Sequence, residues 1–89
     1  MKRIAFLPEA FANFTDWANI DRETHAKAKI VSLVRDIQRD PFAGLGKPEP
    51  LKHELAGLWS RRITEEHRLV YRVTDDDIVI ISWRYHYSK

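Results

Sequence analysis

The chain has 89 residues, of which 44% are hydrophobic and 31% charged, with a formal net charge of +2. These values predict one folded domain over residues 1–89 with a modest core, and they exclude an intrinsically disordered chain. The chain has no cysteine and no apolar run of roughly 18 residues, which excludes disulfide scaffolds, thiolate chemistry and membrane-spanning helices, so we expect a soluble cytoplasmic protein.

The N-terminal half predicts one strand followed by two amphipathic helices. Alternating apolar residues indicate a strand over residues 2–6, and Pro8 suits the first position of a helix that continues to about residue 19. A second helix is predicted from an N-cap at Asp21 to a stop at Asp40 and Pro41. The apolar face of the first helix contains Phe11, Phe14, Trp17 and Ala18, and that of the second contains Ala26, Ile30, Leu33, Val34 and Ile37.

The C-terminal half predicts an antiparallel meander. Residues 40–50 contain three prolines and two glycines and therefore read as a loop. Period-two alternation then indicates strands over residues 51–55, 58–63, 67–73 and 77–87. The predicted fold is α+β, with an N-terminal strand and two amphipathic helices packed on one face of a small antiparallel sheet.

The register of the last two strands decides which side chains share a face. A three-residue loop would place Thr74 opposite Ile78, and we prefer this register to one that pairs Val73 with Ile78. It makes one face wholly apolar, as a sheet covered by helices requires. That face would contain Leu69, Tyr71, Val73, Val79, Ile81 and Trp83, and alternation in the preceding strand adds Trp59 and Ile63.

The same register predicts a cluster of cations on the polar face. It places Arg68 opposite Arg84 and diagonal to His86, and alternation sends Arg62 to this face with Ser60. Facing arginines repel each other unless an anion lies between them, and a phosphate would fit there; a solvated sheet face is the alternative. For the other two arginines of these strands, Arg61 and Arg72, we expect solvent exposure.

Two more residues are candidates for this site. Glu49 lies between two prolines, which favour extended backbone, so it belongs either to a stiff exposed loop or to a carboxylate held against the basic face. Alternation leaves open whether His86 is inert or catalytic. No pair of histidines has metal-binding spacing, so we expect no metal and no cofactor.

Three motifs together resemble a known family: PEPLKH at 48–53, WSRRITEEHRLVY at 59–71 and RYHY at 84–87. The chain resembles the YoeB/Txe toxins of bacterial toxin–antitoxin systems, within the RelE/ParE superfamily, most densely over residues 41–87. The resemblance implies the RelE-like microbial ribonuclease fold and a metal-independent endoribonuclease that cuts mRNA in the ribosomal A site and so inhibits translation. The implied partners are a YefM/Axe-like antitoxin, the ribosome and mRNA, and a homodimer is left open.

The resemblance also implies roles for individual residues. The family's general base matches Glu49, its phosphate-binding residues match Lys52, Arg62 and Arg68, its general acid matches His86 and the neighbouring aromatic matches Tyr87. Arg84 joins the phosphate-binding set through the predicted register. RNA cleavage without a metal needs a base, cations for the phosphorane and an acid, and these residues supply all three.

A protein without catalytic activity on the same fold is the alternative, for example a ParE-like inhibitor of DNA gyrase. Such a protein has no need for Glu49, Arg68 and His86 together. The chain departs from the family pattern at Trp83, where a smaller residue is usual, and in continuing through Ser88 and Lys89. Trp83 belongs to the predicted apolar face, so we expect it to alter packing more than chemistry.

Overall fold

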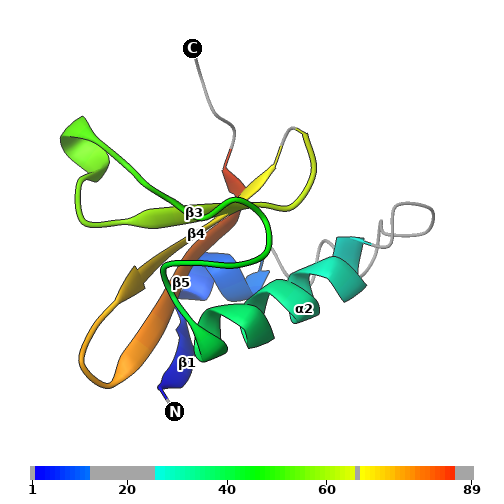
Figure 1. Cartoon of the computed structure of the whole chain (residues 1–89), viewed down its shortest axis with the longest axis horizontal. Coiled ribbons are helices and arrows are strands. Elements are labelled where there is room, and N and C mark those ends of the chain that lie inside the picture. Colours follow the sequence, from blue (N-terminus) through cyan, green and yellow to red (C-terminus); the bar gives the residue numbers. More distant parts are fainter. Residues whose placement is uncertain (1, 13–25, 66, 86–89) are drawn as a thin grey trace.

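The structure is a computed structural model that describes residues 2–12, 26–65 and 67–85, and at residues 26, 27, 84 and 85 only the backbone. Its elements are β1 (Arg3–Phe6), α2 (Ala26–Arg39), β2 (Glu49–Pro50), a 3₁₀ helix (His53–Leu55), β3 (Trp59–Arg62), β4 (Arg68–Val73) and β5 (Asp77–Tyr85) (Figure 1). Residues 8–12 are also helical, while the rest of the predicted first helix and the Asp21 cap lie outside the described residues.

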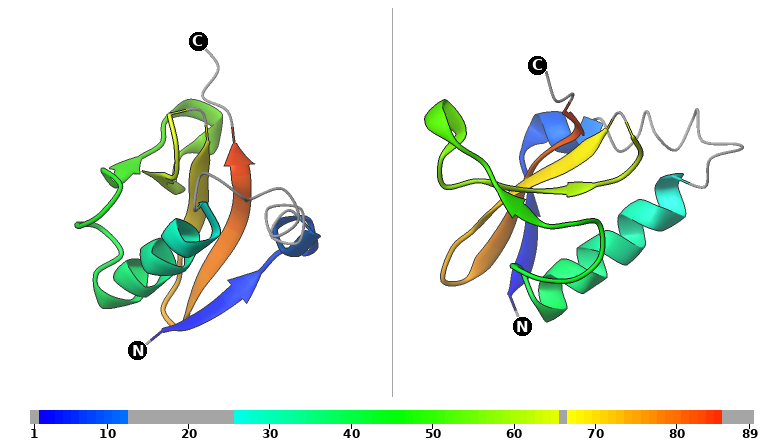
Figure 2. Two further views of the ribbon diagram at one scale, coloured as in Figure 1. Left: turned by 90° about the vertical axis from the view of Figure 1, so that its right-hand side faces the viewer. Right: turned by 45° about the horizontal axis from the view of Figure 1, so that its top comes forward.

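The strands form one mixed sheet in the order β1-β5-β4-β3-β2. Strands β2 to β5 pair antiparallel, as the predicted meander requires, and β1 joins the edge of the sheet parallel to β5. Helix α2 lies across one face of this sheet (Figure 2, left). The predicted α+β class is therefore confirmed. No helix within the described ranges has both the length and the apolar character to cross a lipid bilayer.

The core lies between the helices and one face of the sheet. The predicted stripe of α2 is confirmed, because Ile30, Leu33 and Ile37 are buried in this core. The first helix contributes Ala10, whereas Phe11, which was expected to face the core, is 62% exposed. Other buried members of the core are Ile63, Leu69, Tyr71, Ile78, Ile80 and Trp83.

Trp83 has the packing role expected for it. Its side chain is buried, and its indole Nε1 donates a hydrogen bond to the carbonyl oxygen of Ala10 at 2.7 Å. A buried indole needs such an acceptor, because its N–H group would otherwise lose its hydration without compensation. The bond ties β5 to the helical residues 8–12.

The preferred register of the β4–β5 hairpin is wrong. Val73 pairs with Ile78, because Thr74 closes the turn by accepting a hydrogen bond from the backbone N–H of Asp77 at 2.9 Å. Two irregularities follow, and each adds one residue to β5 relative to β4. They change the alternation, so that Ile78 and Ile80 face the core in place of Val79 and Ile81, while Trp83 faces the core as predicted.

The predicted strand over residues 51–55 is also wrong. The strand next to β3 is β2, two residues earlier, and most of the predicted segment belongs to the 3₁₀ helix. His53 has a φ of 59°, a left-handed conformation that ends an extended segment. Glu49 therefore belongs to a paired strand.

Candidate functional site

The predicted site residues of β2, β3 and β4 lie in two adjacent rows across the sheet. In the first row Glu49 pairs with Ser60, which pairs with Val70; in the second, Arg62 pairs with Arg68. Paired residues and residues two apart on a strand point to the same face. Because the intervening residues of β3 and β4 enter the core beneath α2, both rows lie on the face opposite the helix.

Glu49 and Arg68 form an ion pair on this face. The distance from Arg68 Nη1 to Glu49 Oε1 is 3.5 Å, and the side chains are 14% exposed for Arg68 and 45% for Glu49. Since β3 separates β2 from β4, the two side chains meet over β3. A carboxylate exposed to this extent is accessible to a ligand, and a pair of this length contributes little to stability.

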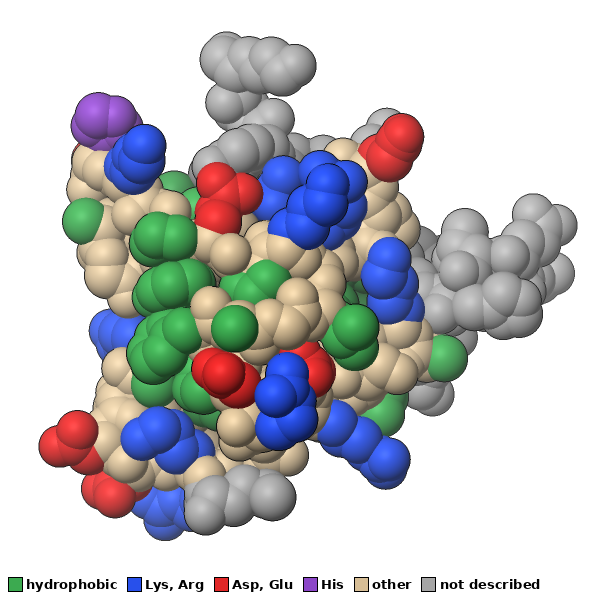
Figure 3. Space-filling view, viewed as in Figure 1, with side chains coloured by type: hydrophobic (Ala, Val, Ile, Leu, Met, Phe, Trp, Pro, Cys, Tyr) green, Lys and Arg blue, Asp and Glu red, His purple; other side chains and the backbone are tan. Residues whose placement is uncertain are grey.

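Arg62 adds a second guanidinium beside the ion pair. It is half-buried and pairs directly with Arg68 across the β3–β4 ladder. Basic side chains gather next to an acidic one in the upper part of the view in Figure 3. Two arginines and a carboxylate at one place can bind a phosphodiester and accept a proton from a neighbouring hydroxyl.

The structure does not place the other predicted site residues beside the Glu49–Arg68 ion pair. Lys52 is exposed just before the 3₁₀ helix and makes no ion pair with Glu49 within 4.0 Å, as far as the described part of the chain goes. His86 and Tyr87 lie outside the described residues. Arg68 pairs with Tyr85, so the predicted opposition of Arg68 and Arg84 is wrong by one residue, because the two irregularities between the turn and Arg68 add two residues to β5.

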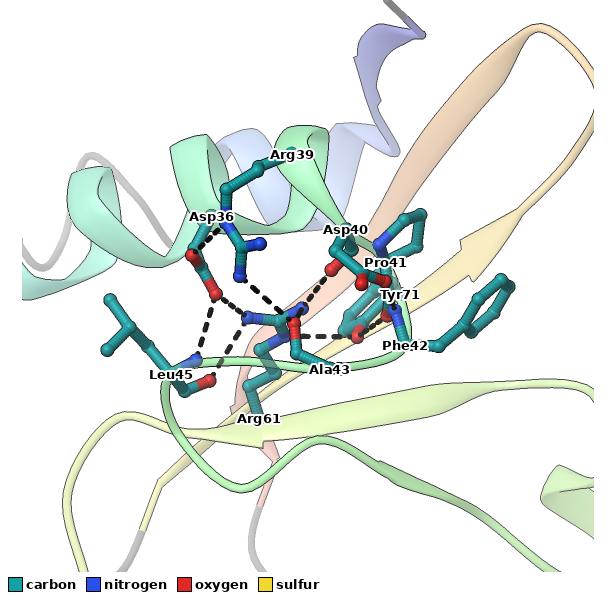
Figure 4. Close-up of polar contacts among 9 residues, drawn as sticks. All are labelled: Asp36, Arg39, Asp40, Pro41, Phe42, Ala43, Leu45, Arg61 and Tyr71. Atoms are coloured by element: carbon teal, nitrogen blue, oxygen red, sulfur yellow. Dashed lines mark hydrogen bonds and ion pairs between the residues drawn. The ribbon is translucent and has the colours of Figure 1, made fainter.

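Arg61 was expected in solvent, and that expectation is wrong. Its side chain is fully buried and donates to five acceptors (Figure 4). Nη1 reaches Asp36 Oδ2 at 2.6 Å and the Leu45 carbonyl at 3.1 Å. The remaining acceptors are the carbonyls of Asp40 at 2.6 Å and Ala43 at 3.3 Å, and Tyr71 Oη at 3.2 Å. Arg72, by contrast, is exposed as predicted.

The groups around Arg61 titrate outside their ordinary ranges. Hydrogen bonds from Arg39, from the Leu45 N–H and from Arg61 hold the pKa of Asp36 well below its usual range. The same contact with Asp36 raises the pKa of Arg39. Burial raises the pKa of the Tyr71 phenol, whose hydroxyl donates to the Pro41 carbonyl at 2.6 Å. At neutral pH Asp36 is therefore ionised, Arg39 is protonated and the Tyr71 phenol is neutral.

This network fixes the loop that leads into the candidate site. Four of the five acceptors of Arg61 fall between residues 36 and 45, so they hold the loop against β3. The loop then joins the sheet edge, where the N–H of Arg62 donates to the Gly46 carbonyl at 2.7 Å. Gly46 has a φ of 78°, and a Cβ there would lie 2.9 Å from the Leu33 side chain. A buried cation on one face of β3 thus anchors the segment that presents Glu49 on the other.

The family is decided by a match over most of the chain. The family model for the YoeB-like toxin of bacterial type II toxin-antitoxin systems matches residues 6–87. The chain belongs to the YoeB family. As a YoeB-family member it is a toxin of a type II toxin–antitoxin system, as its motifs predicted.

Curated relatives and solved structures agree with the YoeB assignment. The toxin RelK of Mycobacterium tuberculosis is 52% identical over 87 residues, which cover 98% of this chain and 100% of that protein. The YoeB dimer of Staphylococcus aureus is 44% identical with a TM-score of 0.87, over 97% of this chain and 98% of that one. In the heterotetrameric YoeB–YefM toxin–antitoxin complex of S. aureus, the matching chain is 43% identical with a TM-score of 0.84, over 98% and 99%.

Proposed function

We propose that this YoeB-family toxin is a ribosome-dependent endoribonuclease that cleaves mRNA in the A site and so inhibits translation. The observation that carries the proposal is the ion pair between Glu49 and Arg68, with Arg62 paired beside it on the same face of the sheet. A carboxylate next to two guanidinium groups suits the cleavage of a phosphodiester by its own 2′-hydroxyl.

In the proposed reaction Glu49 accepts the proton of the ribose 2′-hydroxyl while that oxygen attacks phosphorus. Arg68 and Arg62 stabilise the negative charge that develops on the phosphorane. His86 donates a proton to the departing 5′-oxygen, so the products are a 2′,3′-cyclic phosphate and a 5′-hydroxyl. Lys52 and Tyr87 would contact the RNA around the reacting phosphate. The mechanism uses acid–base catalysis with neither a metal nor a cofactor.

Dependence on the ribosome follows from the weakness of a carboxylate as a base at neutral pH. A weak base is effective only when the reacting hydroxyl and phosphorus are already aligned, and alignment can lower the barrier by about 7–11 kcal/mol. In this proposal the ribosome holds the A-site codon in that alignment, and the toxin supplies the acid–base groups.

The proposed partners follow those named for the relatives. The S. aureus homologue forms a complex with YefM and has also been solved as a dimer. For this chain we propose neutralisation by a YefM-like antitoxin, a homodimer as one assembly state, and action in the cytoplasm, where the ribosomes are. We also propose that residues 1–89 form one toxin domain.

The test maps mRNA 5′ ends in a translating extract that contains the purified toxin. The wild type should produce cuts in phase with codons, and Glu49→Gln and His86→Gln should each lower the cleavage rate by about 10²–10⁴-fold. Glu54→Gln is the matched control, because Glu54 is an exposed carboxylate in the neighbouring 3₁₀ helix. Arg68→Ala removes a proposed phosphate-binding arginine. Its matched control is Arg72→Ala, because Arg72 is exposed on the same strand.

Two results would contradict the proposal. If the wild type makes no codon-phased cuts, the nuclease function fails, and inhibition of gyrase supercoiling would then favour the ParE-like alternative. If cutting persists undiminished in both Glu49→Gln and His86→Gln, the activity stands but the assigned acid and base are wrong.

A further inference from the structure

Ser60 holds a buried hydroxyl next to the candidate site. The residue is fully buried, and its Oγ has no hydrogen-bond partner within the part of the chain that the structure describes. Burying a hydroxyl without a partner is unfavourable, and most buried hydroxyls in folded proteins have one. An alanine would fill almost the same space without this cost, so the serine calls for an explanation.

The position of Ser60 connects it to Glu49. The two residues are direct partners in the β2–β3 ladder, so their Cβ atoms lie about 4.5–5.5 Å apart on the same face of the sheet. The ion pair between Glu49 and Arg68 reaches from β2 to β4 and must pass over β3 at Ser60 and Arg62. Ser60 is therefore one of the two residues of β3 that lie on this face between the strands of Glu49 and Arg68.

Substrate binding changes what Glu49 can contact. The 3.5 Å contact between Arg68 and Glu49 is too long to hold the guanidinium in place, so an incoming RNA phosphodiester can draw Arg68 toward itself. When Arg68 turns to the phosphate, Glu49 loses a cationic neighbour at the moment when it must be oriented toward the 2′-hydroxyl. A hydrogen-bond donor on the same face of the sheet would keep the carboxylate in place.

We propose that Ser60 is a positioning residue, whose hydroxyl donates a hydrogen bond to the Glu49 carboxylate when Arg68 engages the RNA phosphate. The proposal rests on the nuclease function proposed above. Ser60 keeps its proton throughout, and its contribution is to orient the base. The competing explanation is that Ser60 is a small packing residue, for which alanine would serve equally well.

The test compares Ser60→Ala, Ser60→Thr and wild type in single-turnover cleavage of mRNA on stalled ribosomes, with thermal unfolding measured on the same samples. Ser60→Ala should lower the maximal cleavage rate by about 10–100-fold, the effect of one hydrogen bond to a charged group. The ribosome concentration at half-maximal rate and the melting temperature should not fall, and Ser60→Thr should restore most of the rate. Ser32→Ala is the control, since Ser32 is exposed on α2.

The possible outcomes separate the two proposals. A wild-type rate in Ser60→Ala would overturn the positioning role while leaving the nuclease function intact. A loss of rate together with a lower melting temperature in Ser60→Ala would make Ser60 a packing residue and would also overturn it. Absence of cleavage by the wild type would instead contradict the nuclease function itself.

Discussion

Replacing Arg61 by methionine should destabilise the fold strongly while leaving a side chain of similar length. Removing one member of a buried ion pair typically costs about 3–5 kcal/mol. Asp36 would keep its contacts with Arg39 Nε at 3.0 Å and with the Leu45 N–H at 2.8 Å, and its side chain is 13% exposed. We therefore expect a loss near the lower end, about 3 kcal/mol, from a total stability of about 5–10 kcal/mol.

Urea unfolding, monitored by tryptophan fluorescence, measures this loss, because Trp83 belongs to the core and Trp59 packs against it. Arg72→Met is the matched control, since Arg72 is exposed on the adjacent strand, and it should change the free energy of unfolding by less than about 0.5 kcal/mol. A double mutant with Asp36→Asn gives the coupling between the two charges. A loss below about 1 kcal/mol in Arg61→Met would refute the reasoning that this guanidinium anchors the loop.

Three further predictions concern the same region. The low pKa of Asp36 stabilises the fold above the ordinary aspartate pKa of 3.8, and this contribution is lost as the pH falls below that value. Asp36→Asn should therefore show a weaker loss of stability in acid, and equal acid sensitivity in urea melts would contradict this. Because the pKa of Tyr71 is raised, one phenol should titrate late in ultraviolet absorbance, and the contribution of Tyr71 to stability should fall as the pH rises above 10.0. Tyr71→Phe should remove the late step, and an unchanged titration would contradict this prediction. Gly46→Ala should lower the melting temperature, because at a φ of 78° its Cβ would lie 2.9 Å from the Leu33 side chain. Gly57→Ala is the control for the strain of a positive φ alone, since no atom lies within 4 Å of its Cβ. Equal losses of melting temperature in the two variants would refute the clash at Gly46.

The sequence predicts elements with regular spacing well. The stripe of Ile30, Leu33 and Ile37 follows the helical period, and it faces the core as expected. Alternation in β3 likewise sends Ser60 and Arg62 to one face of the sheet, opposite Ile63. Such patterns are readable because each side chain's direction depends only on its own element.

The sequence does not predict features that depend on distant partners. Alternation put Arg61 in phase with Trp59 and Ile63, yet its charge argued for solvent, and the acceptors that permit its burial include Asp36, 25 residues away. The β4–β5 register failed because the extra residues in β5 leave no signature in a pattern of alternating apolar residues. The apolar run from Ile78 to Ile81 fits either phase.

The parallel pairing of β1 with β5 has a consequence for the order of folding. The hairpin between β4 and β5 closes a turn of a few residues, whereas Arg3 and Asp77 meet across a separation of 74 residues. The longer closure costs about 2 kcal/mol more in chain entropy, and this cost must be met before the contacts of β1 can form. Strand β1 therefore joins a sheet that the hairpin has already begun, and its amide protons should exchange with solvent before those of β4.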